Sequence, residues 1–196
     1  SGGRTDNFMM RVVDFLYAFP FLIVVILMQA FFKAQARQGA EGLFGAMVSI
    51  NNSMGGMFFL FIAIALVNWL GLARIARGQV LSQKKKEYVE AAKSIGATDS
   101  SVAVRHILPN ILGPLIVFET LAIPGYIFLE AFLSFIGLGV DPPTPSWGIM
   151  ISEAAKGIRS YPNQVLVPAI FLSITTLAFN FLGDGLRDAF DPRMKE

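Results

Sequence analysis

Residues 56–76 read GMFFLFIAIALVNWLGLARIA, and this stretch decides the class of protein. An α-helix needs about 20 mainly apolar residues to cross the roughly 30 Å hydrocarbon core of a bilayer. The stretch is apolar over that length, ends at Arg74, and carries Trp69 near that end, where aromatic side chains favour a membrane interface. The sequence therefore predicts a membrane-spanning helix, which we place at residues 56–73.

The composition of the whole chain agrees with a membrane protein. Of its 196 residues, 54% are hydrophobic and only 15% are charged, whereas about 25% are charged in an ordinary soluble domain. The absence of cysteine excludes disulfide bonds, thiolate metal sites and a cysteine nucleophile. The formal net charge of +2 is too small to indicate a nucleic-acid partner.

Three further apolar stretches have the length of a membrane span. They lie at residues 12–32, 111–137 and 164–183. Pro20 lies inside the first, so we expect a kink there, and we predict the second to be one bent helix around Pro124 and Gly125. The fold class that follows is an all-α integral membrane protein with four spans in one domain, residues 1–196.

The distribution of basic residues predicts the orientation in the membrane. Four spans place the amino terminus, the loop 74–110 and the carboxyl tail on one side, and the loops 33–55 and 138–163 on the other. The second side holds only Lys33, Arg37, Lys156 and Arg159, which leaves 12 of the 16 Lys and Arg residues for the first. Cytoplasmic loops are enriched in Lys and Arg, so we expect the loop 74–110 and the carboxyl terminus to be cytoplasmic.

The cytoplasmic loop contains the charged stretch KKKEYVEAAKSIGA at residues 84–97. Helical spacing predicts a short amphipathic helix with two faces. One face has Tyr88, Ala91, Ala92 and Ile95, and the other has Glu87, Glu90 and Ser94. Gly96 is well placed to end this helix.

A second short helix, SSVAVRHI, is expected to follow in the same loop. Thr98 or Asp99 can cap its start, and Pro109 and Asn110 mark its exit before the next span. Small residues at Ala91, Ala92, Gly96 and Ala97 permit close approach by another protein, and the nearby carboxylates could pair with its cations. The alternative is a basic amphipathic helix on anionic lipid headgroups, although its apolar face has no Trp or Phe to anchor it.

The stretch EYVEAAKSIGATDSSVAVRHILPN resembles the EAA motif of ABC-type importer permeases. In that motif Glu-Ala-Ala is followed by three residues, Gly, nine residues and I-x-L-P. The matching residues are Glu90, Ala91, Ala92, Gly96, Leu108 and Pro109, and His106 occupies the place of the motif's Ile. The flanking stretches DFLYAFPFL, ARIARGQVLS, EAFLSFIGLGVDPPTPSWG and FNFLGDGLRDAFDPR are similar to the peptide and nickel branch of that family.

The resemblance is closest to the C-type permease subunit of oligopeptide and dipeptide importers, and it implies a type I importer (MetI-like) transmembrane domain. Such subunits usually have six spans, with the EAA loop between the fourth and fifth. We therefore expect this chain, which starts without Met, to be the later part of a longer polypeptide and to supply the last four spans. The loop 33–55 is longer than we expect between those spans.

The resemblance also implies partners and a role for the loop. The loop helix would couple the spans to ATPases through Glu87, Tyr88, Glu90, Ala91, Ala92, Gly96, Ala97, Leu108 and Pro109. The expected partners are a B-type permease, two cytoplasmic ABC ATPases that bind ATP and Mg, and an extracytoplasmic binding protein, in a bacterial or archaeal plasma membrane. The chain has no G-x-x-x-x-G-K-[ST], so we expect a non-catalytic subunit without a cofactor.

Polar residues inside the spans have two readings. Glu119 and Glu130 lie in an apolar helix, where a charge costs at least about 2.5 kcal/mol unless it is paired, hydrated or protonated. Either residue could line a substrate path or form a structural pair. For Asn68 and Asn180 we predict hydrogen bonds between helices. His106 is the single histidine, so we expect no metal site.

Two competing functions stay open from the sequence. Nickel and other small-solute importers share these motifs, but no extra histidine or carboxylate cluster favours a metal. A membrane channel or scaffold whose loop binds lipid is the alternative from a different class. Copurification of an ATPase would separate transport from the scaffold.

Overall fold

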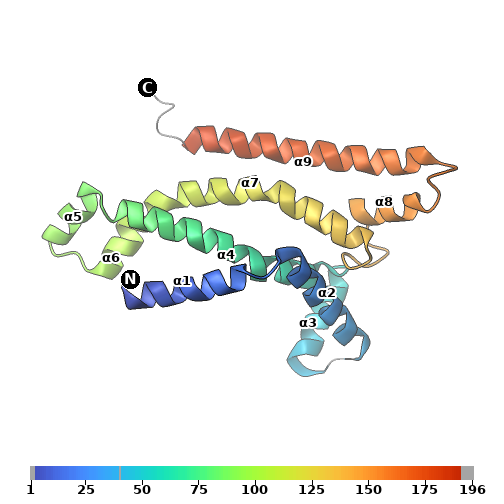
Figure 1. The fold of residues 1–196 in the computed structure, drawn as a ribbon, viewed down its shortest axis with the longest axis horizontal. Coiled ribbons are helices and arrows are strands. Elements are labelled where there is room, and N and C mark those ends of the chain that lie inside the picture. The colour runs from blue at the N-terminus through green and yellow to red at the C-terminus, as the bar shows by residue number, and fades with distance from the viewer. Residues whose placement is uncertain (1–2, 40, 191–196) are drawn as a thin grey trace. The chain divides into compact units, whose positions relative to one another are not determined.

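The structure, a computed structural model, describes residues 3–39 and 41–190 (Figure 1). Every regular element in these residues is helical, which confirms the predicted all-α class. The helices are α1 (Arg4–Tyr17), α2 (Phe21–Arg37), α3 (Gly42–Ser53), α4 (Met57–Gln83), α5 (Glu87–Ser94), α6 (Asp99–Ser101), the π-helix η1 (Val102–Ile107), α7 (Leu108–Phe135), α8 (Trp147–Ala155) and α9 (Pro162–Phe190). Arg193 and Lys195, which count toward the basic tail, lie outside the described residues.

Three helices within the described residues are long and apolar enough to cross a membrane: Met57–Gln83, Asp99–Phe135 and Pro162–Phe190. A fourth candidate is the pair α1 and α2, which meet at 78° across a short break. The apolar stretch 12–32 is therefore bent sharply at Pro20, where we expected a kink, and it consists of parts of two helices. Pro20, at the N-cap of α2 with φ −61°, has no N–H to continue the hydrogen bonds of α1, which explains why α1 ends before it.

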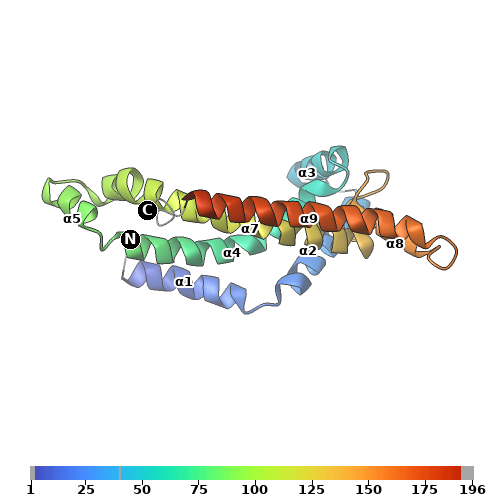
Figure 2. The same cartoon turned by 90° about the horizontal axis from the view of Figure 1, so that it is seen from above.

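Helix α4 continues well beyond the predicted end of its span. Arg74 and Arg77 lie on the helix, not after it, and each pairs with a carboxylate of α1. Arg77 contacts Asp6 at 2.7 Å, and Arg74 contacts Asp14 at 2.7 Å. Both views show α1 alongside this part of α4 (Figure 2). The two ion pairs fix α1 to the basic end of α4.

The chain forms two compact units, and α4, α7 and α9 contribute to both. The first unit falls within residues 1–14, 69–122 and 179–196, and the second within residues 15–68 and 123–178. In the first unit, the buried cluster is Val89, Ala92, Val102, Ile107 and Ile111, which we call the loop cluster. It joins α5 and η1 to the start of α7.

The second unit has a larger apolar core between α2, α4 and α7. Its buried members are Val25, Leu60, Ala63, Ile64, Leu129, Leu133 and Val140. An aromatic stack extends this core, because the rings of Phe32 and Phe59 lie 4.7 Å apart and that of Phe44 lies 5.6 Å from Phe59. Phe44 belongs to α3, so the segment 33–55 contains a helix that packs onto the core. The segment 138–163 contains α8, which ends at Ala155.

Candidate functional site

The stretch with the Glu-Ala-Ala sequence forms helix α5 and a tight turn after it. Ile95 caps the helix, and Gly96 follows with φ +88°. The Gly96 N–H donates to the Lys93 carbonyl (3.0 Å) and the Ala97 N–H to the Ala92 carbonyl (3.1 Å). These two bonds form a Schellman motif, in which a residue without Cβ adopts the left-handed conformation most easily. Gly96 therefore ends the helix, as the sequence indicates.

The inner face of α5 packs onto the loop cluster. Val89 is 2% exposed and Ala92 is 5% exposed, and the half-buried Tyr88 packs against the same residues. The Tyr88 hydroxyl also donates to the Gln83 side chain at the end of α4 (2.9 Å). Residues from α5, η1 and α7 share this cluster, so α5 is anchored against the start of the span α7.

The apolar face that we predicted for α5 is only partly correct. Ala92 and Tyr88 point inward, but Ala91 is exposed and Ile95 is 88% exposed. The helix ends at Ser94, so Ile95 no longer follows the helical spacing, and Val89 takes the central buried place that the spacing did not assign. Ala92 is buried and so is unavailable to a partner, Ala97 is half-buried against the same cluster, and Ala91 and Gly96 are exposed.

The outer face of α5 consists of exposed residues of mixed chemistry. They are Glu87, Glu90, Ala91, Ser94 and Ile95, which we call the docking face. Two carboxylates thus lie beside a small side chain and a solvent-exposed isoleucine. Charge complementarity with a cationic partner, together with burial of the isoleucine, would favour binding of a protein surface here.

The loop reaches α7 without a break in the helix, which differs from our prediction of an exit at Pro109 and Asn110. Thr98 caps α6 by accepting a hydrogen bond from the Ser101 N–H (3.3 Å). Helix α6 then continues through η1 into α7 as one helix, Asp99–Phe135. In η1 the Leu108 N–H donates to the Ala103 carbonyl, five residues back.

The π-helix explains how Pro109 is accommodated in a continuous helix. In a regular α-helix the proline ring would clash with the carbonyl of Arg105, four residues earlier. The wider turn of η1 ends at Ile107, two residues before Pro109, and relieves this clash. Asn110 adds a side-chain hydrogen bond to the His106 carbonyl (2.6 Å). Leu108 and Pro109 are exposed and belong to the first turn of α7.

Electrostatic contacts within the loop are local. Lys93 of α5 pairs with Asp99 of α6 at 3.1 Å, and both side chains are largely exposed. An exposed pair of this kind contributes little to stability. Lys84, Lys85 and Lys86 are exposed in the turn between α4 and α5. The basic turn and the acidic docking face therefore lie next to each other in the sequence.

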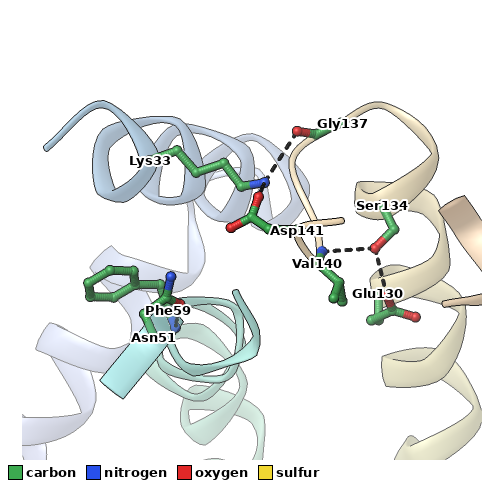
Figure 3. A network of polar contacts seen from close by, with 8 residues as sticks. All are labelled: Lys33, Asn51, Phe59, Glu130, Ser134, Gly137, Val140 and Asp141. Atoms are coloured by element: carbon green, nitrogen blue, oxygen red, sulfur yellow. Dashed lines mark hydrogen bonds and ion pairs between the residues drawn. The ribbon is translucent and has the colours of Figure 1, made fainter. Parts of the chain in front are cut away.

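Glu130 near the carboxyl-terminal end of α7 belongs to a structural network (Figure 3). Its carboxylate accepts a hydrogen bond from the Ser134 hydroxyl (2.6 Å), and the Ser134 oxygen accepts one from the Val140 N–H (3.1 Å). Lys33 of α2 pairs with Asp141 in the same turn (2.8 Å). The network fixes the chain where it leaves α7, and it favours the structural reading of Glu130. Neither Lys33 nor Asp141 was singled out from the sequence, because their pairing joins residues far apart in the chain.

The other polar residues of the spans are not brought together with Glu130. Glu119 is half-buried on α7, about three helical turns from Glu130. Asn180 is exposed on α9. The Asn68 side chain donates to the Ile64 carbonyl of its own helix (3.0 Å), so the bond between helices that we predicted is replaced by a local one. Among the described residues, no group of three His, Cys, Asp or Glu residues could hold a metal ion.

Comparison with known proteins gives a family for this arrangement. Residues 1–196 match the family described as "Binding-protein-dependent transport system inner membrane component". The match covers the whole chain, including α5, its glycine turn and the helix that follows. This match and the long apolar helices together identify the chain as a multi-pass membrane protein.

Individual relatives are permease proteins of peptide transport systems. The chain is 42% identical over 192 residues to the oligopeptide transport system permease protein OppC of Escherichia coli K12, which covers 98% of this chain and 57% of the relative. It is 42% identical over 195 residues to OppC of Bacillus subtilis 168, covering 100% and 57%. It is 41% identical over 195 residues to the dipeptide transport system permease protein DppC of the same organism, covering 99% and 54%. The chain spans about half the length of the curated relatives it matches.

Proposed function

The chain belongs to the family of binding-protein-dependent transport system inner membrane components, and we propose that it is a permease subunit of an ATP-driven importer of oligopeptides or dipeptides. The names of the relatives support this substrate class. In this proposal the chain forms half of a translocation pathway with a B-type permease. Two cytoplasmic ATPases bind ATP and Mg and carry out hydrolysis, and an extracytoplasmic binding protein delivers the peptide.

The observation that carries the proposal is the two-sided construction of α5. Its inner face is buried in the loop cluster through Val89 and Ala92, so α5 is not free to lie independently on a membrane surface. Its docking face presents Glu87, Glu90 and Ile95 outward. An anchored helix with an accessible outer face is suited to bind a protein groove and to transmit a displacement.

The displacement would pass from α5 to the span through continuous contacts. The loop cluster connects α5 directly to Ile107 and Ile111, and the helix Asp99–Phe135 runs from the loop into the membrane. Closure of an ATPase dimer would pull α5 inward, and α7 would move with it. The two orientations of the pathway would then be the two states whose populations ATP shifts.

The orientation follows from the same proposal. Docking of a cytoplasmic ATPase puts α5 and the carboxyl terminus in the cytoplasm, which agrees with the basic residues in residues 74–110. The outer side then holds α3 and α8. Glu119 is our candidate for a polar residue of the pathway, and it is tested by peptide uptake with Glu119→Gln.

The experiment that tests the coupling role is copurification from mild detergent with the full-length protein. Glu90→Lys reverses a charge on the docking face, and we expect at least about tenfold weaker retention of the ATPases, because losing a charge pair at an interface costs about 2 kcal/mol or more. Glu153→Lys is the matched control. Glu153 is also exposed and is also followed by two alanines, but it lies on α8.

Three outcomes decide between the functions. Retention of a second permease and ATPases by wild type and Glu153→Lys, with loss of the ATPases in Glu90→Lys, supports the importer and the coupling role. Normal retention and normal peptide uptake in Glu90→Lys contradicts the coupling role. Recovery of the chain without any ATPase, with the loop binding only to anionic vesicles, contradicts the importer and favours the scaffold.

A further inference from the structure

Helix α3 (Gly42–Ser53) is not explained by docking of an ATPase or by passage of a peptide. We infer that α3 lies in the outer boundary of the bilayer, with one stripe of its surface among the acyl chains of the outer leaflet. The inference goes beyond the proposed function, since it concerns how the outer end of the α2–α4 region is held in the membrane.

One side of α3 is fixed to the core of the second unit. The Phe44 ring lies 6.4 Å from Phe32 of α2 and 5.6 Å from Phe59 of α4. The buried Asn51 accepts a hydrogen bond from the Phe59 N–H in the first turn of α4 (3.1 Å). That N–H has no partner within α4, so Asn51 caps the helix (Figure 3). Helix α3 is therefore held beside α2 and level with the start of the span α4 (Figure 1).

The remaining surface of α3 is divided into an apolar and a polar part. Leu43, Ala46, Met47, Ile50 and Met54 follow helical spacing, and we call them the apolar stripe. Leu43 is 82% exposed and Ile50 45% exposed. Ser49 and Asn52 are exposed on another side of the helix, which we call the polar stripe, and Ser53 lies between the two stripes. A helix wholly in water has no reason to sort its exposed residues in this way, whereas a helix at a lipid surface does.

Charge supports the same environment. No Asp, Glu, Lys, Arg or His lies between Glu41 and Arg74, so α3 is as free of charge as the membrane span that follows it. The other outer helix, α8, and its flanking segments carry Asp141, Glu153, Lys156 and Arg159. Those charges indicate contact with water around α8. Their absence from α3 indicates contact with hydrocarbon.

Other apolar residues are exposed on the helix that packs beside α3. Helix α2, which packs beside α3, exposes Leu27 (63%) and Phe31 (55%) on its outer half. Leu43 and Ile50 add exposed apolar surface on α3. The polar stripe carries no cation, so the contact depends on the hydrophobic effect and not on anionic headgroups. We therefore expect insertion into zwitterionic lipid without a dependence on salt.

The test uses nitroxide labels at single introduced cysteines. Residues 1–196 have no cysteine, and any cysteine elsewhere in the full-length protein or in its partners is first replaced by serine. Leu43→Cys and Ile50→Cys report on the apolar stripe, and Ser49→Cys on the polar stripe of the same helix. Ser160→Cys, exposed after α8, is the aqueous control, and Ile174→Cys, exposed within α9, is the membrane control. Power saturation is measured with oxygen, which concentrates in lipid, and with a water-soluble nickel chelate. The sample is the full-length protein with its partners in phosphatidylcholine nanodiscs.

The expected result is that labels at Leu43 and Ile50 are relaxed by oxygen, as at Ile174, and are protected from the nickel chelate by several-fold relative to Ser49 and Ser160. Relaxation by the nickel chelate at Leu43, equal to that at Ser49, would show an aqueous helix and overturn the inference. Protection from both reagents would also overturn it, because it would show that a protein covers the stripe. Repeating the measurement without the binding protein would then tell whether that protein or the second permease is the cover.

Discussion

The sequence Glu-Ala-Ala occurs twice in this chain, in α5 and in α8, and the two helices use it differently. In α5 the second alanine, Ala92, is buried in the loop cluster, and the helix ends in a Schellman motif at Gly96. In α8 both alanines are half-buried, and the helix ends in successive three-residue turns without a left-handed glycine. The tripeptide is thus compatible with two structural roles.

The anchoring of the two helices differs as well. Helix α8 is held at its start, where Trp147 stacks on Phe171 of α9 with ring centroids 5.8 Å apart. Gly148 lies so close to α7 that a Cβ would overlap the Ala131 carbonyl. Its Glu-Ala-Ala is at the other end. In α5 the tripeptide is divided between two faces, because Ala92 is buried in the loop cluster whereas Glu90 and Ala91 belong to the docking face. The neighbouring residues complete each face, with Val89 on the inner side and Glu87 and Ile95 on the outer side.

The largest effect is expected for Ala92→Asp. A carboxylate at this buried position would have no partner in the loop cluster, at a cost of about 3 kcal/mol. We expect faster hydrogen exchange across residues 87–97 and loss of peptide uptake. Ala155→Asp places the same change in α8 at a half-buried position, where the charge can reach water. Equal exchange in the two variants would show that Ala92 is not part of a packed anchor.

Gly96→Ala should have the next largest effect. A residue with Cβ at φ +88° costs about 1–2 kcal/mol, which should loosen the end of α5. Gly157→Ala is the control, because a Cβ there would lie 3.9 Å from the Ala154 carbonyl oxygen in ordinary contact. The effect of Gly96→Ala is measured by hydrogen exchange at residues 87–97. The effect of Gly157→Ala is measured by hydrogen exchange at residues 147–158. A similar response of both segments would refute a special role for the left-handed glycine.

The helix caps should give a smaller difference. Thr98→Ala removes the acceptor for the Ser101 N–H, and Ser146→Ala removes the acceptor for the Ile149 N–H. Each should cost about 1 kcal/mol of local stability. Only Thr98→Ala should also lower ATPase activity stimulated by a loaded binding protein, since Thr98 lies between α5 and α7. Reduced stimulation in both variants would mean that α8 contributes to coupling.

The smallest effect is expected for Lys93→Ala. The Lys93–Asp99 pair is solvent-exposed, and such pairs contribute little. We expect unchanged hydrogen exchange and unchanged ATPase retention. A clear loss of either would mean that the ion pair, and not the loop cluster, holds α5.

Much of the fold follows from local features of the sequence. Three of the four apolar runs that predict the spans lie within α4, α7 and α9, to within two residues at their outermost ends, because a bilayer requires long uncharged stretches. Gly96 and Thr98 act where the sequence places them, because caps depend on a few neighbouring residues. The charged end of α4 was not predicted to be helical, since the ion pairs of Arg74 and Arg77 with α1 join distant residues.

In the candidate site, too, local features follow from the sequence, whereas contacts between distant residues do not. Helical spacing identifies α5 but not its buried face, because Val89 is buried only through its contact with residues of η1 and α7. The continuous passage through Pro109 depends on the π-helix, which the sequence does not signal. Helix α3 lies in a segment that sequence reasoning treated as a loop. Small and polar residues interrupt the apolar pattern of α3 in the sequence. They hide both the side that packs on the core and the exposed apolar stripe.

The most direct test of the coupling role is a crosslink from the docking face to an ATPase. Ala91→Cys puts one reactive thiol on the exposed face of α5, and Glu153→Cys puts one on α8; residues 1–196 have no other cysteine, and any cysteine elsewhere in the protein is replaced by serine. With a short bifunctional reagent in the native membrane complex, we predict an ATPase crosslink from Ala91→Cys that changes in yield when ATP is added, and none from Glu153→Cys. No ATPase crosslink from Ala91→Cys, or an equal yield from both variants, would contradict the coupling role of α5.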